Sequence, residues 1–307
     1  MKQKIEAALA KIKTWSTPVV PEEKKLIPCT LCGSLSFKPS MLCEGFSYVR
    51  CSVCGLVQMN PQPCEAEIKR RYGAEITTGS HGEDYLAYEL TNEEAFLNLQ
   101  LLALNDAGFN ELETFYSAKP GDSLPGGKPR LLDIGCATGS LLEHLQERGW
   151  ESTGVEISKP QAEYGRKKRN LDIKSLSLKE NNFPGNCFNV VLASHLIEHL
   201  NDPAALVKEI RRILIASGRF FVTTPNIAGF QARLFGGRWR SAIFDHLYLF
   251  SVKTLSRLLQ ENGFVIEKIS TWGGLAAGTA PVPVKRFFDK AAKRFAFGDV
   301  MIIRARL

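Results

Sequence analysis

Residues 130–139, Arg-Leu-Leu-Asp-Ile-Gly-Cys-Ala-Thr-Gly, are the stretch that decides the fold. The apolar run Arg130–Ile134 is typical of a buried strand, and Gly135 and Gly139 follow it closely. Glycine lets the backbone turn sharply and approach a ligand without a clash from Cβ. A helical pattern, Ser140–Arg148, begins directly after the second glycine. The stretch therefore predicts a strand, a ligand-binding turn and a helix.

The turn differs from two common nucleotide-binding loops. A P-loop ends in Gly-Lys-Ser/Thr, whereas Gly139 is followed by Ser140 and Leu141. The dinucleotide fingerprint Gly-x-Gly-x-x-Gly would need glycine at Ala137 and at Ser140. The pattern therefore favours a ligand that has no pyrophosphate.

Two carboxylates accompany the turn. Glu156 lies at the end of the predicted strand Ser152–Ile157, about twenty residues after Gly135, where an acid can accept both hydroxyls of a ribose. Asp133 lies just before the turn, where it can orient loop amides and hold a cationic amino group. The alternative for Asp133 is a structural role in tying down the turn.

Strand-like and helix-like stretches alternate after residue 129. The alternation predicts an α/β fold with a mostly parallel sheet that has helices on both faces. Further strands are expected at Val190–Ser194, Arg219–Thr224, Phe264–Ser270 and Val300–Arg306. Further helices are expected at Lys159–Arg169, Pro203–Ala216 and Val252–Asn262.

Residues 131–139 and Glu156 resemble the first two motifs of class I S-adenosylmethionine-dependent methyltransferases. Residues 189–203, 218–226 and 246–264 are similar to the subgroup that contains the ubiquinone-biosynthesis O-methyltransferases. The resemblance runs from about residue 130 to the end of the chain. It implies a Rossmann-like seven-stranded sheet and S-adenosylmethionine as the cofactor.

The chain departs from the family pattern at two places. Asn189 stands where the family often has Asp, and Ile173–Lys179 has no acid to read the adenine amine. Only Ser175 and Ser177 are available there, so backbone groups are expected to recognise the adenine. The residues expected to bind the cofactor are Asp133, Gly135, Cys136, Ala137, Gly139, Glu156, Ile157 and Ser194.

Three histidines lie where the resemblance places the methyl acceptor. Methyl transfer from a sulfonium mainly requires alignment, and a neutral imidazole can accept the proton that the acceptor loses. His195 directly follows the predicted strand Val190–Ser194, and His246 lies in the segment expected to line the acceptor pocket. We predict His195 and His246 as candidate catalytic bases, with a structural role as the alternative. For His199, next to Glu198, packing is the favoured role.

Six of the eight cysteines lie before residue 65. Cys29-x-x-Cys32 and Cys51-x-x-Cys54 are separated by 18 residues, a spacing typical of four-thiolate zinc sites. Four thiolates close a tetrahedral site, so the expected zinc is structural. Residues 49–61 resemble the zinc ribbon that precedes sugar C-methyltransferases.

The 307 residues are predicted to form four parts. These are an N-terminal helix (1–25), the zinc-binding module (26–64), a helical connector and linker (65–129) and the methyltransferase domain (130–307). No apolar run approaches the roughly 18 residues of a membrane span, and the first residues lack the apolar block of a signal peptide. The expected compartment is the cytoplasm.

The charge of the chain does not identify its binding partner. The net charge of +7 favours anionic partners without naming one. Arg238–Arg240 could meet an anionic acceptor or be a surface feature. The basic amphipathic stretch Val284–Phe297 could be a lid, a membrane contact or a packed helix with a solvated face.

The leading hypothesis is a methyltransferase that acts on a small molecule or glycan precursor, at oxygen. One alternative is an RNA methyltransferase that grips RNA with the zinc module. Against it, Ala193–Leu196 lacks the Asn/Asp-Pro-Pro-aromatic motif of enzymes that methylate base amines. A second alternative is a cofactor-binding protein without turnover, because a fold does not imply an activity.

Overall fold

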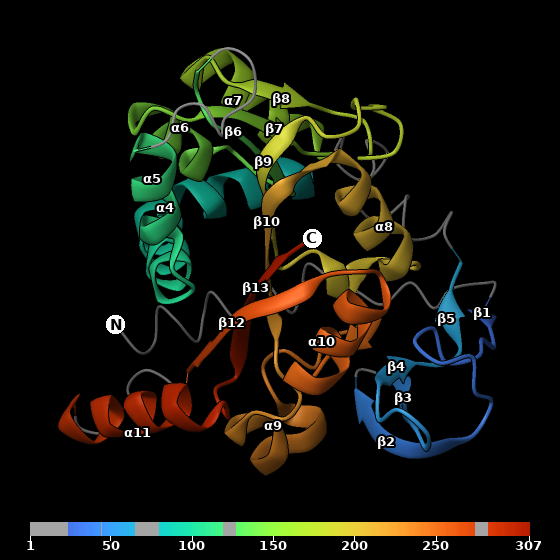
Figure 1. Ribbon diagram of the computed structural model, residues 1–307. Helices are drawn as coiled ribbons and strands as arrows, with labels where there is room; N and C mark the ends of the chain where they lie inside the picture. The colour runs from blue at the N-terminus through green and yellow to red at the C-terminus, as the bar shows by residue number, and fades with distance from the viewer. Residues whose placement is uncertain (1–23, 44, 65–79, 119–126, 274–281) are drawn as a thin grey trace.

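A seven-stranded sheet with helices on both faces forms the centre of the structure, and a four-stranded sheet packs beside it (Figure 1). The structure is a computed structural model, which describes residues 24–43, 45–64, 80–118, 127–273 and 282–307. Within these ranges, no helix is both long enough and apolar enough to cross a membrane.

The strands of the central sheet lie in the order β12-β13-β10-β9-β6-β7-β8. The strands from β10 to β8 are parallel, whereas β13 is antiparallel to both of its neighbours. The predicted Rossmann-like, mostly parallel sheet of seven strands is therefore confirmed. The strands are β6 (Arg130–Ile134), β7 (Glu151–Val155), β8 (Asp172–Lys174), β9 (Phe188–Ser194), β10 (Leu214–Pro225), β12 (Val265–Trp272) and β13 (Val300–Arg306).

Most helices of the domain link successive strands, and the connector before residue 129 adds two more helices. The linking helices are α6 (Ser140–Glu147), α7 (Lys159–Arg169), α8 (Pro203–Ile213), α10 (Val252–Glu261) and α11 (Val282–Phe295). The connector consists of α4 (Ser80–Asp106) and α5 (Phe109–Ala118). Short elements between β9 and α10 are η2 (Ile197–His199), α9 (Phe230–Phe235), η3 (Gly236–Arg238) and β11 (Tyr248–Leu249).

Three local expectations were wrong. The helix expected to reach Ala216 ends at Ile213, because Leu214 already pairs with β9 and begins β10. The strand β8 was missed, since it has three residues and only Ile173 is apolar. Lys24–Lys25, expected to end a helix, form the short strand β1. The rest of that predicted helix lies outside the described residues.

Alternate residues of the central strands face two separate hydrophobic cores. On one face, residues such as Leu131 and Val190 pack with apolar side chains of α4, α5, α6 and α7. On the other face, Leu132 and Val191 pack with α8, α10 and the cysteine-rich segment. Burial on both faces explains why these strands are continuously apolar in the sequence.

The cysteine-rich segment is integrated into the larger domain. Its strands β2 (Phe37–Cys43), β3 (Phe46–Cys51) and β4 (Val57–Met59) form a sheet whose fourth strand is β11, about 190 residues later in the chain. Tyr248 and Leu249 of β11 pair with Gln58 and Val57. A two-residue strand, β5 (Gln62–Pro63), pairs with β1. The predicted boundary at residue 64 therefore separates two parts that share one core.

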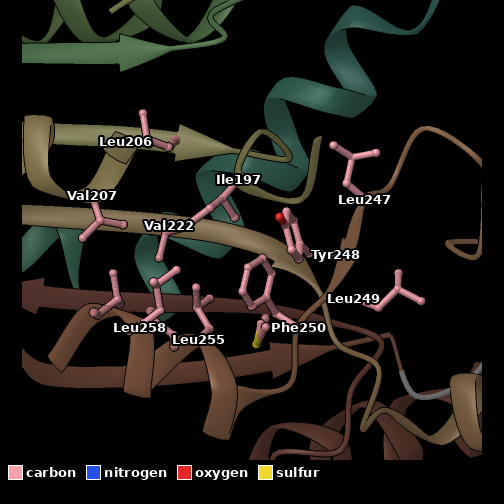
Figure 2. Packing of buried hydrophobic residues seen from close by; sticks show 14 of the residues in the cluster. Ile197, Leu206, Val207, Val222, Leu247, Tyr248, Leu249, Phe250, Leu255 and Leu258 are labelled. Atoms are coloured by element: carbon pink, nitrogen blue, oxygen red, sulfur yellow. The ribbon is translucent and has the colours of Figure 1, made fainter. Parts of the chain in front are cut away.

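Figure 2 shows how β11 is anchored to the central sheet. Tyr248 and Phe250 pack with Val222 of β10, Ile197 of η2 and Leu255 of α10. All five side chains are almost fully buried. The segment that joins the two sheets is therefore held from both sides.

Candidate functional site

The glycine turn lies at the carboxyl end of β6, between the ends of β7 and β9. The N–H of Gly135 donates to the carbonyl oxygen of Val155 at 2.7 Å. Gly135 has φ +77° and is exposed, so its backbone is open to a ligand. Gly139 has φ +81°, and a Cβ at this position would overlap the side chain of Leu171. Both glycines are thus required by the backbone, as the sequence predicts.

Cys136 fills a space that a second glycine provides. A Cβ on Gly154 of β7 would lie 2.5 Å from the Cys136 sulfur. Cys136 is buried, and this burial raises the pKa of its thiol. The side chain therefore acts as a small packed group, and its backbone is the part that can meet the cofactor. The sequence carried no signal for the role of Gly154.

Glu156 follows β7 and braces the turn. One carboxylate oxygen accepts the N–H of Ala137 at 3.0 Å, and the other accepts the N–H of Ser158 at 2.7 Å. Burial raises the pKa of Glu156 above its ordinary value. Ala137 has φ +50°, an unusual conformation for a residue with a side chain, and the hydrogen bond to Glu156 helps to stabilise it.

Asp133 lies near the end of β6 and is 3% exposed. Its strand pairs with β7 and β9, so neighbouring strands flank this carboxyl on both sides. Burial, together with the negative charge of Glu156, raises the pKa of Asp133 to about 7. The site thus holds two acids that are poorly solvated and destabilise each other's charge.

A third acid, Glu89 of α4, joins this group and was not predicted. One of its oxygens accepts the N–H of Thr138 at 3.0 Å and the Thr138 hydroxyl at 2.9 Å. The other oxygen is buried and has no hydrogen-bond partner among the described residues. Burial also raises the pKa of Glu89. The sequence shows acids four residues apart on this helix but not which face meets the turn.

Arg169 holds α4 against the turn. Its guanidinium pairs with Glu93 of α4 and with Glu143 of α6, and the Arg169 side chain is only 12% exposed. Arg169 ends α7, so one cation joins three helices. It also lowers the pKa of Glu89 through its charge, although the effect of burial is larger.

The three acids match the chemistry of the expected cofactor. S-adenosylmethionine brings a sulfonium and an ammonium, and a buried carboxylate is stabilised by a nearby cation. Its ribose hydroxyls are donors, and Glu156 is an acceptor at the end of β7. The unpartnered oxygen of Glu89 adds a further acceptor. These features fit a cationic nucleoside.

The remaining predicted cofactor contacts lie at the edges of this site. Ile157 follows Glu156 and is 43% exposed, and Ser194 ends β9. On the adenine side, the Ser175 hydroxyl accepts a hydrogen bond from Arg166 at 2.6 Å. The N–H of Ser177 donates to Glu180 at 3.0 Å.

A second polar group lies beyond the end of β9. His195 has φ +50° and a half-exposed side chain, and its Nδ1 lies 3.4 Å from a carboxylate oxygen of Glu198. Leu196, the next residue, lies beside Gly135: a Cβ built there would be 3.7 Å from a Leu196 methyl carbon. The group therefore adjoins the glycine turn.

Glu198, His199 and His246 form the buried part of this group. Their ligand atoms all lie within 4.8 Å of one another, and the two imidazole rings are 4.7 Å apart at an angle of 78°. Burial lowers the pKa of His246 to about 3. Burial alone would raise the pKa of Glu198, but His195 and the neighbouring imidazoles lower it to about 2. Glu198 is thus a carboxylate and His246 is a neutral imidazole.

The hydrogen bonds of the two rings show which nitrogen of each ring carries the proton. Nδ1 of His199 lies 3.0 Å from the carbonyl oxygen of Asp245, and Nδ1 of His246 lies 2.8 Å from that of Ser241. A carbonyl can only accept, so each Nδ1 carries the proton and each Nε2 has a lone pair. The two imidazoles therefore share one group with the Glu198 carboxylate, of which one oxygen lies 3.4 Å from Nδ1 of His195.

The cysteine-rich segment supports the loop that carries His246. The Tyr48 hydroxyl lies 2.7 Å from the carbonyl oxygens of both Ile243 and His246. The Cys43 thiol donates to the carbonyl oxygen of Ala242. His246 therefore depends on residues about 200 positions earlier in the chain.

Cys29, Cys32, Cys51 and Cys54 are brought together as predicted. All four sulfurs lie within 4.8 Å of one another, with the closest pairs at 3.4 and 3.5 Å. Tetrahedral zinc with bonds of about 2.3 Å separates its sulfurs by about 3.8 Å, so the group fits zinc. Backbone N–H groups of residues 53 and 54 lower the pKa of Cys51 to about 6, against the effect of burial.

A protein-family model described as a methyltransferase domain matches residues 94–269, which is more than half of the chain. The chain belongs to this methyltransferase-domain family. The sheet order and the glycine turn agree with the class, an S-adenosylmethionine-dependent methyltransferase domain.

Curated relatives of the methyltransferase domain include ubiquinone biosynthesis O-methyltransferases. The ubiquinone biosynthesis O-methyltransferase of Idiomarina loihiensis is 32% identical over 112 residues, which cover 34% of this chain and 45% of that protein. The mitochondrial ubiquinone biosynthesis O-methyltransferase of Rattus norvegicus is 29% identical over 126 residues, which cover 38% and 36%. The chain spans less than half the length of these relatives.

Solved methyltransferase structures are also similar to this chain. One from Archaeoglobus fulgidus is 21% identical and covers 68% of this chain and 99% of its own, with a TM-score of 0.45. A geranyl diphosphate C-methyltransferase from Streptomyces coelicolor is 17% identical and covers 64% and 80%, with a TM-score of 0.44.

Binding of S-adenosylmethionine should weaken as the pH falls below about 7. The pKa of Asp133 is raised to about 7, so below this pH the carboxyl is protonated and attracts a cation less. The affinity should fall by up to about tenfold for each further pH unit, and binding in this range should release a proton. Titration calorimetry in buffers of different ionisation enthalpy measures both quantities. Asp133→Asn should bind weakly without this pH dependence. A constant Kd with no proton release would contradict the assignment.

Replacement of one thiolate should remove the metal. Purified protein should contain one zinc at this site, so Cys32→Ser should contain one zinc per chain fewer than the unchanged protein, as measured by elemental analysis. Its thermal midpoint should fall by about 5 °C or more, because β4 pairs with β11. Cys64→Ser, outside the group, is the matched control and should keep both zinc and stability. Equal zinc content in the two variants would exclude this site.

Proposed function

We propose that this methyltransferase domain transfers a methyl group from S-adenosylmethionine to an oxygen of a small-molecule or glycan-precursor acceptor. The observation that carries the proposal is the position of His195. This imidazole is half exposed, adjoins the glycine turn through Leu196 and has Glu198 at its Nδ1. A base is thus available on the side of the turn where β9 ends.

The cofactor is proposed to lie across the ends of β6, β7 and β9. Glu156 accepts the ribose hydroxyls, and Asp133 and Glu89 attract the positive charges. The backbone of residues 135–137 lies along the methionine part. Ile157 and Ser194 complete the contacts. When bound, S-adenosylmethionine supplies a methyl group on a sulfonium, and an acceptor in line with the C–S bond can displace it.

His195 is assigned as the base that takes the proton from the methyl acceptor. Glu198 is ionised and faces Nδ1 of His195, so the Nδ1–H tautomer is favoured and Nε2 keeps its lone pair. Nε2 takes the acceptor proton as the oxygen–carbon bond forms and the carbon–sulfur bond breaks. Glu198 also holds the ring in position and stabilises the resulting imidazolium.

Glu198, His199 and His246 are assigned to a divalent cation. Both histidines donate Nδ1–H to carbonyl oxygens, which is the usual arrangement of metal-ligating histidines. Both oxygens of Glu198 are buried, and one of them lies 3.4 Å from Nδ1 of His195. A cation there would supply positive charge that favours the ionised form of an acceptor oxygen. The predicted role of His246 as a base stays a prediction, and its burial favours the ligand role.

The acceptor class rests on two supports. The two curated relatives described above are ubiquinone biosynthesis O-methyltransferases by name, which favours an oxygen acceptor. The base is an imidazole in a half-exposed position, which suits a hydroxyl group. We further propose that zinc binds the four cysteines in a structural role, that the chain divides at residues 25, 64 and 129, and that it acts in the cytoplasm.

Turnover should depend on His195. Incubation with labelled S-adenosylmethionine and a panel of phenolic, nucleotide-sugar and glycan acceptors should give a product heavier by one methyl group. His195→Ala should lower kcat by about 100-fold or more while the Kd for the cofactor stays unchanged. His144→Ala, on α6, is the matched control and should keep full activity.

Three results would contradict this proposal. Turnover of the His195→Ala variant at the rate of the unchanged protein would show that His195 is not the base. A methylated RNA product, with no product from any small acceptor, would favour the RNA methyltransferase instead. Cofactor binding without turnover on either class of acceptor would favour the non-catalytic alternative.

Turnover should also depend on a divalent cation. Dialysis against a chelator should abolish activity, and Mg²⁺, Mn²⁺ or Zn²⁺ added back should restore it. His199→Ala should lose activity even with the cation in excess, because one ligand is missing. The zinc content of the cysteine site must be measured in parallel, so that loss of this zinc is distinguished from loss of the second cation. Full activity after chelation, with that zinc retained, would exclude the cation.

A further inference from the structure

Helix α4 has two apolar faces, and the domain covers only one of them. Ala103 and Leu104 are buried in the core that also holds α5 and α6. On the other face, Leu99 is 53% exposed and Leu102 is 61% exposed. A helix that packs against a domain on one side normally presents polar residues on the other. The open face of α4 departs from this rule.

The open face has the residue spacing of a coiled-coil seam. Its residues recur at intervals of three, four, three, four and three positions, and none of them is buried. They are called the α4 stripe below: Tyr85, Tyr88, Asn92, Ala95, Leu99 and Leu102. Intervals that average 3.5 keep side chains on one face of a helix, where a second helix can pack. The stripe therefore suits a helical partner along about 26 Å of α4.

A second run with the same spacing lies near the start of the sequence. Residues 1–23 precede β1 and lie outside the described ranges. Apolar residues recur there at intervals of four, three, four and three positions: Met1, Ile5, Ala8, Ile12 and Trp15. In a helix, such as the one predicted for this segment, these residues share one face. The segment therefore offers an apolar seam with the period of the α4 stripe.

The two runs carry opposite charge. Residues 1–16 contain four lysines and one acid. Residues 80–118, which form α4 and α5, contain eight acids and no Lys or Arg. Cations from other elements pair with four of these acids, which are Glu93, Asp106, Glu111 and Glu113. Glu94 is exposed and has no ion-pair partner among the described residues. The acidic helix therefore favours a cationic partner.

A path of contacts leads from β1 to the loop that precedes β11. Lys24 of β1 pairs with Pro63, and the Asn201 side chain donates to the carbonyl oxygen of Pro63 at 3.2 Å. Asn201 lies just after η2, where Nδ1 of His199 is 3.0 Å from the carbonyl oxygen of Asp245. The described chain therefore begins on the side of the molecule where this loop lies.

The loop in turn lies near the start of the α4 stripe. Partial burial, followed by the negative charges of Glu89, Glu156 and Asp245, raises the pKa of Tyr85 to about 12, so Tyr85 is within electrostatic reach of Asp245. Residues 16–23 contain two prolines, and eight extended residues of this kind span about 25 Å. A linker of this length can follow the path from β1 to Tyr85.

We propose that residues 1–15 form a helix that docks on the α4 stripe in the antiparallel direction. The linker enters at the Tyr85 end, so Trp15 lies beside Tyr85 and Ile5 lies beside Leu99. Both seams bury their apolar residues, and the lysines of the docked helix lie near the acids of α4. The stripe is thus a docking surface for a segment of the same chain.

A second copy of the chain fits the stripe less well. Two α4 helices packed face to face would bring identical acids together, and neither helix has a Lys or Arg to pair with them. Like charges across an interface are unfavourable. The lysines of residues 1–16 remove this conflict. The charge pattern therefore favours the segment over a second α4.

Hydrogen exchange of the full chain, followed by mass spectrometry, tests the docking. Amides of residues 5–15 should exchange at least about tenfold more slowly than in a free peptide of the same sequence, because a docked helix protects them. Leu99→Ser with Leu102→Ser should bring their exchange to within about twofold of the free peptide. Lys4→Glu with Lys11→Glu should lower the protection by about two- to fivefold, as expected for exposed ion pairs.

A matched variant and internal reporters separate docking from general effects. Leu234→Ser with Phe235→Ser removes exposed apolar area on α9 and should leave the exchange of residues 5–15 unchanged. Amides of β6 and β9 should exchange in every variant as in the unchanged protein. Loss of docking is then distinct from unfolding, and neither measurement depends on methyl transfer.

Cross-linking of a mixture of unlabelled and ¹⁵N-labelled protein identifies the chain that supplies the docked segment. A carbodiimide joins lysines to acids, so it should link lysines of residues 2–13 to acids of α4. Both linked peptides should carry the same label, because the docking is within one chain.

The docking would be overturned by any of three results. Exchange of residues 5–15 at the rate of the free peptide would show that the segment is not docked. Protection that survives Leu99→Ser with Leu102→Ser would show that it docks elsewhere. Cross-linked peptides with mixed labels would assign the stripe to a second copy of the chain.

Discussion

The site depends on the burial of acids beneath one glycine turn. Asp133, Glu156 and Glu89 come from a strand, the end of a strand and a helix, and burial raises the pKa of all three. Such a group is costly without compensation, because an unpaired charge in a protein interior loses its hydration. A ligand with positive charge removes that cost. The electrostatics of the turn therefore favour a positively charged ligand.

The acceptor side depends on a different constraint, the pairing of two segments that are far apart in the sequence. Strand β11 is the edge of a sheet whose other strands come from the cysteine-rich segment. Tyr48 reaches the carbonyl oxygen of His246, and Tyr248 and Phe250 fill the core behind. A metal at the four cysteines would therefore stabilise more than its own loops. It would keep His246 beside Glu198 and His199.

These two constraints determine how the proposed sites are arranged in the molecule. The proposed cofactor site lies where parallel strands end, the group of His195, Glu198, His199 and His246 adjoins the glycine turn, and the chain after β10 continues into α9. The segment between β10 and α10 contains α9, η3 and β11 and carries His246 of this group (Figure 1).

The amino-acid sequence by itself determined the local features. Gly135 and Gly139, the position of Glu156 after the second strand and the two Cys-x-x-Cys pairs were readable because each depends on residues close in the chain. Helix α7 and strand β13 were predicted to the residue for the same reason. Strand β8 escaped, because three residues are too few for a periodic pattern.

Only the tertiary structure decided which distant groups meet. Nothing in the sequence shows that Glu89 faces Thr138, that Gly154 makes room for Cys136, or that the sheet of the cysteines closes on β11. His199 was expected to be a packing residue, and it is packing that brings it to His246. The physical reason is the same in each case: periodicity and spacing report neighbours along the chain, whereas burial and charge act between neighbours in space.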